Sequence, residues 1–152
     1  MTALAALSVA SCAPRAYDSF NTLGVLPPQP PTPIWIGAVR GSSAAALTGA
    51  AAVTPSQTPG WAHVLISVAN VSTSGSMYAW SLRSGDCSSQ GSVIGPADRY
   101  ADFVIRADGS GGAEAVVPLS LKSAGGPYTI VATPVMAGSG PGACADLARS
   151  TM

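Results

Sequence analysis

The chain has 152 residues, of which 47% are hydrophobic and only 9% are charged, against roughly 25% charged residues in an average soluble domain. Seven basic and seven acidic side chains cancel, so the sequence carries no electrostatic footprint for nucleic acid or for an anionic membrane surface. The length suits one domain with tails, and 17 Gly with 13 Pro favour β-structure with many turns.

The N-terminal residues resemble an export signal rather than part of a fold. Residues 2–11 form a short apolar run that ends in small residues, and Cys12 follows directly. This pattern is typical of a secretory signal, and residues 9–12 resemble the bacterial lipobox, in which the Cys is lipidated. The run has no Lys or Arg before it, so a plain apolar tail is the alternative. We interpret residues 1–12 as a signal and lipobox segment with lipid on Cys12, which predicts export to the bacterial periplasm or outer cell envelope and a membrane anchor.

A proline-rich segment follows and is predicted to be a linker over residues 13–37. Six prolines lie between residues 13 and 33, which favours an extended polyproline II conformation over pairing in a sheet. We expect a disordered N-terminal tail that works as a spacer between a membrane and the domain. The predicted domain covers residues 38–148 and leaves a short tail at 149–152. Trp35, flanked by Ile34 and Ile36, is a candidate either for the start of the first strand or for packing against the edge of the domain.

The predicted domain consists of short strands separated by turns, and no long amphipathic helix is expected. Residues 61–71 give the clearest strand signal in the chain, because one face is entirely apolar (Ala62, Val64, Ile66, Val68) and alternates with His63, Leu65, Ser67 and Ala69. Turns at residues 72–75 and 108–112 each predict a hairpin. This all-β pattern predicts a Greek-key β-sandwich or small β-barrel. Strands are expected at residues 44–53 (with a bulge or kink at Gly49), 61–71, 77–83, 102–107, 113–119 and 128–136, and residues 84–92 are expected to form a polar loop.

The strand at residues 77–83 is expected to present a polar outer face. Side chains alternate across a strand, so Trp80 and Leu82 point one way while Ser81 and Arg83 point the other. The strand leads into the polar loop that carries Cys87.

Three cysteines are an odd number, which needs an explanation in an exported protein. If Cys12 carries lipid, Cys87 and Cys144 remain as a pair. A bridge between them would close a loop of about 58 residues and contribute about 4 kcal/mol in the chain-entropy model. The alternative is three buried thiols in a cytosolic protein.

Five short blocks together resemble the Cu/Zn superoxide dismutase-like domain, most closely its small exported bacterial forms. The resemblance covers about residues 42–148 and implies a Greek-key β-barrel with a disulfide between Cys87 and Cys144. The blocks, in chain order, are Trp80-x-x-x-x-Gly85-x-Cys87, Gly91-x-Val93-Ile94-Gly95-Pro96, Ala107-Asp108-Gly109-Ser110-Gly111, Tyr128-x-Ile130 and Ala143-Cys144-Ala145-Asp146-Leu147.

The chain departs from this family at the metal ligands. The resemblance places two ligand histidines at Ser81 and Arg83 and another at about Thr133, whereas the only histidine is His63 on a different strand. Copper and zinc take imidazole and carboxylate ligands, and a guanidinium, which stays protonated, repels a cation. We therefore expect a non-enzymatic module without a cofactor or metal site. The alternative is a metal-dependent superoxide dismutase whose missing ligands come from a partner.

The vacated positions have two interpretations. Ser81, Arg83 and Thr133 form a possible binding patch, because an Arg fork with two hydroxyls suits a carboxylate, a sulfate or a glycan. Such a patch suggests an envelope protein or glycan as partner. Exposed polar residues on strand faces are common, so the simpler interpretation, ordinary solvated side chains, is favoured by the sequence alone.

Overall fold

The computed structural model describes residues 33–41, 47–69, 74–122, 125–136 and 142–151. The predicted signal segment, the lipid on Cys12, the disordered tail and most of the proline-rich linker fall on residues 1–32, outside this described part, and stay predictions. No helix within the described part is long and apolar enough to cross a bilayer.

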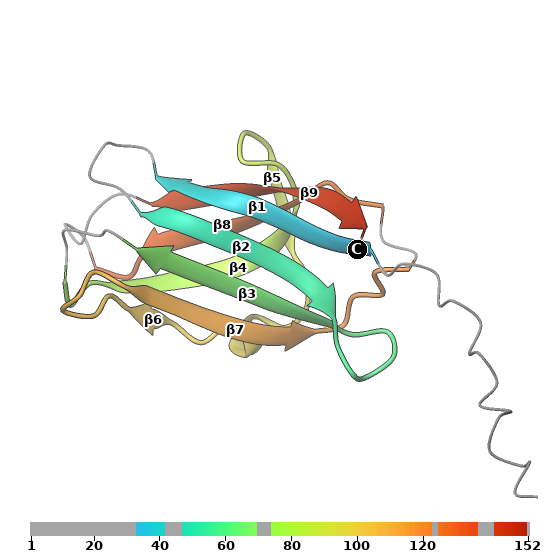
Figure 1. Cartoon of the computed structure of the whole chain (residues 1–152), viewed down its shortest axis with the longest axis horizontal. Coiled ribbons are helices and arrows are strands. Elements are labelled where there is room, and N and C mark those ends of the chain that lie inside the picture. The colour runs from blue at the N-terminus through green and yellow to red at the C-terminus, as the bar shows by residue number, and fades with distance from the viewer. Residues whose placement is uncertain (1–32, 42–46, 70–73, 123–124, 137–141, 152) are drawn as a thin grey trace, which may run out of the picture. The chain divides into compact units, whose positions relative to one another are not determined.

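The described strands form one antiparallel sheet that curls into a half-barrel (Figure 1). The predicted all-β fold is confirmed. The strand order is β5-β4-β8-β9-β1-β2-β3-β7, and β6 pairs with β4 outside this path. The elements are β1 (Pro33–Gly41), β2 (Thr48–Pro55), β3 (Ala62–Ala69), β4 (Met77–Gly85), β5 (Gln90–Val93), the 3₁₀ helix η1 (Ala97–Arg99), β6 (Phe103–Val104), β7 (Gly111–Val117), β8 (Tyr128–Pro134) and β9 (Ala143–Thr151).

The core lies on the concave side of the curled sheet and follows the period-2 alternation of the strands. On β3 the residues at even positions from 62 to 68 are buried, and those at odd positions from 63 to 69 are half-buried or exposed. This agrees with the predicted pattern for residues 61–71. Burying these aliphatic side chains removes apolar surface from water, which is the main favourable term in folding. The largest fully buried side chains include Tyr78, Leu47, Ile66, Leu82, Ile105 and Ile130.

The first strand begins within the residues predicted to be linker. β1 starts at Pro33 and pairs with β2 on one side and β9 on the other, and β9 runs to Thr151, past the predicted domain end. Proline is tolerated as the first residue of a strand, so the linker prolines do not prevent this pairing. Trp35 anchors the strand, because its ring is buried and packs edge-on against Tyr128 with centroids 5.0 Å apart.

The predicted hairpin through residues 72–75 is wrong. β3 pairs with β2 and β7, whereas β4 pairs with β5, β6 and β8. The chain therefore crosses between two separate regions of the sheet after β3. Backbone hydrogen bonds hold the residues before β4 against Ile105, which follows β6. Gly75 N–H donates to the Ile105 carbonyl (2.8 Å), and Ile105 N–H donates to the Ser76 carbonyl (2.9 Å). A turn signal indicates a change of direction but not the strand that the chain meets next.

The second predicted hairpin has its turn but not its strand pairing. Arg106 N–H donates to the Ser110 carbonyl (2.8 Å), and the Asp108 carboxylate accepts from the Ser110 backbone N–H (2.9 Å) and hydroxyl (2.7 Å). The hydrogen bond from the Ser110 hydroxyl is the main reason that the pKa of Asp108 is lowered. The flanking strands diverge, since β6 pairs with β4 and β7 pairs with β3. The turn is thus a corner between two regions of the sheet.

Two local expectations also differ from the structure. The pairing of β2 with β1 and β3 continues in register through Gly49, so the expected bulge there is wrong. A Cβ at Gly49 would collide with the backbone carbonyl of Ser67, so close strand approach explains the glycine. The loop expected over residues 84–92 contains the short strand β5, which pairs with the end of β4.

Candidate functional site

The outer face of β4 carries the two positions where the family resemblance places metal ligands. Tyr78, Trp80 and Leu82 are buried, while Ser81 and Arg83 are half-buried on the opposite face. This agrees with the alternation predicted from the sequence. The inward side chains anchor the strand to the core. The backbone that carries the outward side chains is therefore fixed in position.

The side chain of Arg83 is held in place by two hydrogen bonds. Its Nε donates to the Ser81 hydroxyl (3.2 Å), two residues earlier on the same strand face. Its Nη1 donates to the backbone carbonyl of Gly91 on the neighbouring strand β5 (3.3 Å). A guanidinium has five N–H donors, so donors remain for a further acceptor after these two bonds.

Thr133 lies on the same outer face and completes a hollow with the other two residues. It stands opposite Ala79 in the pairing of β4 with β8. A cavity of about 180 Å³ is lined by Ser81, Arg83, Gln90, Val131 and Thr133, together with Ala79 and Trp80. The structure therefore brings all three vacated positions to one hollow.

A second, larger hollow of about 400 Å³ continues from the first. It shares Gln90, Val131 and Thr133 with the smaller cavity, and Arg40 on β1 lines it as well. We call the two adjoining hollows the arginine groove, defined by Arg40, Arg83, Gln90, Val131 and Thr133. Among the described residues that line it, none is acidic. The groove therefore carries two cations, and an acidic side chain, Asp146, shares an adjoining hollow of about 410 Å³ with Arg40.

A disulfide closes the groove's side near β9. Cys87, in the loop after β4, is bonded to Cys144 on β9 with an S–S distance of 2.07 Å, so the bridge implied by the family resemblance is present. Below it lies the fully buried Thr129, whose hydroxyl is 3.0 Å from Cys144 Sγ and donates to the Ala145 carbonyl (2.9 Å). The Asp146 carboxylate accepts from Cys87 N–H (2.6 Å). These contacts fix the loop against β9.

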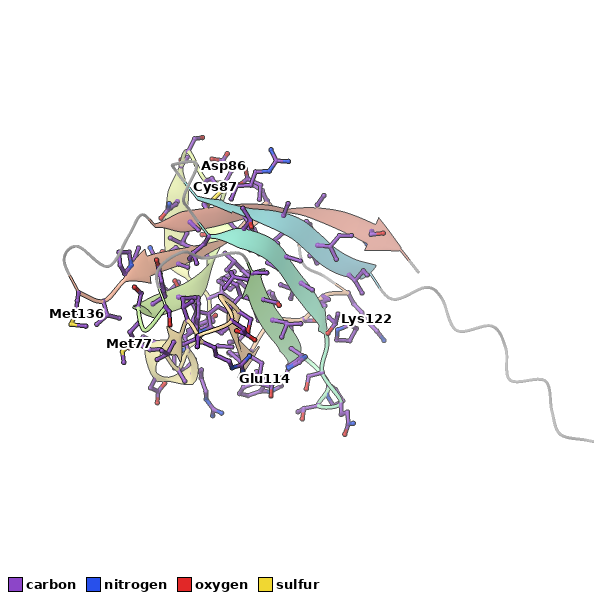
Figure 2. The ribbon with its side chains drawn as sticks, turned by 60° about the vertical axis from the view of Figure 1, so that its left-hand side comes forward. Met77, Asp86, Cys87, Glu114, Lys122 and Met136 are labelled. Atoms are coloured by element: carbon purple, nitrogen blue, oxygen red, sulfur yellow. A yellow bond between two sulfur atoms is a disulfide. The ribbon has the colours of Figure 1, made fainter. Side chains whose placement is uncertain are left out.

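The same loop is also ordered by its own aspartate. Asp86 accepts hydrogen bonds from the Ser88 hydroxyl (2.6 Å), the Ser88 N–H (2.9 Å) and the Ser89 N–H (2.7 Å). The Ser88 hydroxyl bond is the main cause that lowers the Asp86 pKa. Figure 2 shows Asp86 and Cys87 together on one side of the barrel, away from Glu114.

The inner side of β4 supports the groove from below. Trp80 Nε1 donates to the Ala101 carbonyl (2.9 Å), and the ring packs edge-on against Tyr100 with centroids 5.1 Å apart. The Tyr100 hydroxyl donates to the Ile94 carbonyl, and burial raises the pKa of Tyr100 to about 12. This phenol is therefore neutral at physiological pH and acts as a structural hydrogen-bond donor.

The residues at this site do not fit a copper–zinc pair. Ser81, Arg83 and Thr133 offer no imidazole or carboxylate, and such ligands are what both metals take from proteins. His63, the chain's one histidine, lies on β3 and pairs with Glu114 of β7 (3.0 Å), and neither strand neighbours β4 or β8. Donor atoms of Cys87, Cys144 and Asp146 lie within 4.8 Å of one another, but the two sulfurs are bonded to each other, so neither is a thiolate ligand.

Sequence reasoning missed the second arginine of the groove. Arg40 pairs in register with Cys144 across β1 and β9, so its place beside the disulfide depends on a long-range pairing. One signal was available, because Arg40 is the only charged residue between positions 33 and 53. An isolated charge in an apolar strand points outward and marks the solvent face.

No protein-family model matches this chain, and no curated protein is significantly similar to it. The five motif blocks and the geometry of the site are therefore the grounds on which its function has to be inferred.

Proposed function

We propose that this protein is a non-enzymatic binding module with the superoxide dismutase-like fold, whose former metal face binds anionic ligands. The proposal rests on the side chains that this face presents. Where the family's enzymes hold imidazoles, this chain has Ser81, Arg83 and Thr133 lining one hollow. Such a surface attracts anions and repels metal cations.

The disulfide and two motif glycines support kinship with that family. The chain crosses between non-neighbouring strands from β3 to β4 and again from β7 to β8, and such crossings occur in Greek-key folds as in other antiparallel folds. The disulfide joins the two cysteine motifs, and the Gly85 and Gly95 positions of the motifs both have positive φ values, 91° and 81°. Glycine adopts this conformation without strain, which explains why glycine occupies these two motif positions.

The groove suits a ligand with carboxylate or sulfate groups. Arg83 is already held by Ser81 and Gly91, so binding costs it little conformational entropy. A guanidinium binds such oxyanions through paired, charge-assisted hydrogen bonds. Arg40 at the other end of the groove provides a second cation, which favours extended ligands with repeated acidic groups, such as an acidic glycan of the cell envelope.

We further propose that the module is exported and tethered to the bacterial envelope through lipid on Cys12. The apolar run before Cys12 and the odd cysteine left by the disulfide support this. The intact mass of the protein from its native host tests the tether, and a mass with free Cys12 and the whole N-terminus retained would exclude it.

Binding is tested with a hexuronic acid oligomer titrated calorimetrically into the wild-type chain and into Arg83→Ala. We expect the variant to bind at least about tenfold more weakly, equivalent to about 1.4 kcal/mol, because it loses the pre-oriented cation. Inorganic sulfate in a parallel titration shows whether a single anion suffices.

The matched control is Arg99→Ala, which removes an exposed arginine that lies over the Trp61 ring, outside the groove. Arg99→Ala should bind the oligomer like the wild type, and both variants should keep the wild-type thermal midpoint to within a few degrees. Equal affinity of Arg83→Ala and the wild type would refute the proposed binding face.

A further inference from the structure

The outward face of β9, β1, β2, β3 and β7 is apolar over most of its width. These strands lie side by side in Figure 1. The printed pairings place Ala148, Ile36, Ala52, Leu65 and Glu114 in one row across the five strands. The row beside it contains Ala38, Ala50, Ser67 and Gly112. We call this surface the alanine face.

This composition is unusual for the solvent side of an antiparallel sheet, which is normally polar. Ile36 is 47% exposed, Leu65 42% and Val116 38%, so the described part of the chain does not cover these large side chains. Contiguous apolar patches of this kind mark interaction sites more often than free surface. The face is also nearly uncharged at its centre, since Glu114 stands at its edge and pairs with His63.

We propose that the alanine face binds the same face of a second copy of this chain, which forms a two-fold symmetric dimer. An isologous interface has to be complementary to itself, and this face carries both projecting side chains and a hollow. Ile36 and Leu65 project on either side of the small Ala52. A cavity of about 310 Å³ lies beside Leu65 where Ser67 and Gly112 leave space, and Arg106 and Glu114 line it as well.

The size and charge of the face also favour a second copy. Five strands about 4.8 Å apart, each about eight residues long at about 3.3 Å per residue, present roughly 600 Å². A standard interface buries about 800 Å² on each partner, so the face lies at the lower end of specific interfaces and we expect a weak dimer. The hollow on this face carries one cation and one anion, Arg106 and Glu114, so a symmetric pair can place Arg106 of each copy against Glu114 of the other. On β1 the outward Ala38 lies two residues from Arg40, and both line a further hollow of about 410 Å³, so the alanine face adjoins the arginine groove. The proposed dimer does not depend on the proposed binding function, because its test measures association without any ligand of the groove.

The test is sedimentation velocity on the full-length chain over a concentration series from about 1 µM to about 1 mM. We expect the wild type to shift from monomer to dimer across the series. Ile36→Lys, which places a charge at the centre of the alanine face, should remain monomeric throughout. Its side chain is half-exposed, so folding should survive, and an unchanged thermal midpoint at the lowest concentration checks this.

Val135→Lys is the matched control. Val135 is 49% exposed and follows β8, where its N–H donates to the Met77 carbonyl. Met77 and Met136 lie at the same end of the barrel in Figure 2, so this variant charges a second apolar patch instead. Val135→Lys should dimerise like the wild type. A wild type that stays monomeric at every concentration, or a dimer that Val135→Lys breaks and Ile36→Lys does not, would overturn the proposal.

If Ile36→Lys does not fold, Ala50→Lys on the neighbouring row replaces it with the same expectation.

Discussion

Loss of the disulfide in the double variant Cys87→Ser/Cys144→Ser should lower the free energy of unfolding by about 4 kcal/mol. The two cysteines are separated by 57 positions, and in the chain-entropy model a cross-link of this loop length restricts the unfolded chain by about that amount. The loop that carries Cys87 also loses its fixed position over Thr129. Guanidinium denaturation of the variant and the wild type without reductant measures the difference.

The matched control is Cys12→Ser, which removes the third sulfur and should leave the unfolding transition unchanged. Adding a dithiol reductant should lower the wild type to the stability of the double variant and leave the double variant as it was. A double variant that unfolds at the wild-type denaturant concentration would show that the bridge does not stabilise this fold.

Leu82→Ala should lower the free energy of unfolding by about 2–5 kcal/mol, as truncations of fully buried leucines do. Leu82 is 0% exposed, and the strand around it is held at both edges by β8 and β5, so the cavity left by the truncation cannot collapse easily. Thermal and denaturant unfolding at low micromolar concentration measures the loss in the monomer.

The neighbouring substitution Arg83→Ala is the control for this experiment. It removes the two hydrogen bonds to Ser81 and Gly91 from a half-buried outer position, and such bonds contribute about 1 kcal/mol each at most sites. We expect a loss of about 1 kcal/mol or less, because solvent replaces the lost partners. Similar losses at Leu82 and Arg83 would contradict the assignment of the inner and outer faces of β4.

The faces of the strands could be predicted from the sequence, but their partners could not. Alternation of apolar and polar side chains is a local property, so the buried sides of β3 and β4 follow directly from it. Strand pairing depends on contacts between distant segments. The turn at residues 72–75 therefore suggested a hairpin, although β3 in fact pairs with β2 and β7.

The start of the sheet could be predicted only in part: Trp35 is a candidate for the start of the first strand, yet the predicted linker runs to residue 37. The proline content of residues 13–33 predicts a linker, yet Trp35 is buried and β1 occupies a central place in the sheet. Proline lacks a backbone N–H and so cannot donate a hydrogen bond to a neighbouring strand, but this affects only its own position. One proline at the first residue of a strand therefore says little about the residues that follow.

The candidate site could be predicted in part. Ser81, Arg83 and Thr133 were chosen because the motif resemblance places ligands there, and the structure brings them to one hollow. Arg40 and Gln90 were not chosen, because they reach the groove through β1 and β5, whose pairing no local pattern indicates. The cationic character of the groove emerges only when both arginines are placed together.

The account rests on the absence of a metal-binding donor set on the outer face of β4 and β8. The most direct test is to refold the purified chain with excess copper and zinc, dialyse it, and measure bound metal per chain together with superoxide decay. We predict bound metal far below one ion per chain and superoxide decay no faster than in buffer, with the remaining copper lost in His63→Ala. Copper or zinc retained near one ion per chain, with accelerated superoxide decay, would contradict the account and favour a metal-dependent superoxide dismutase.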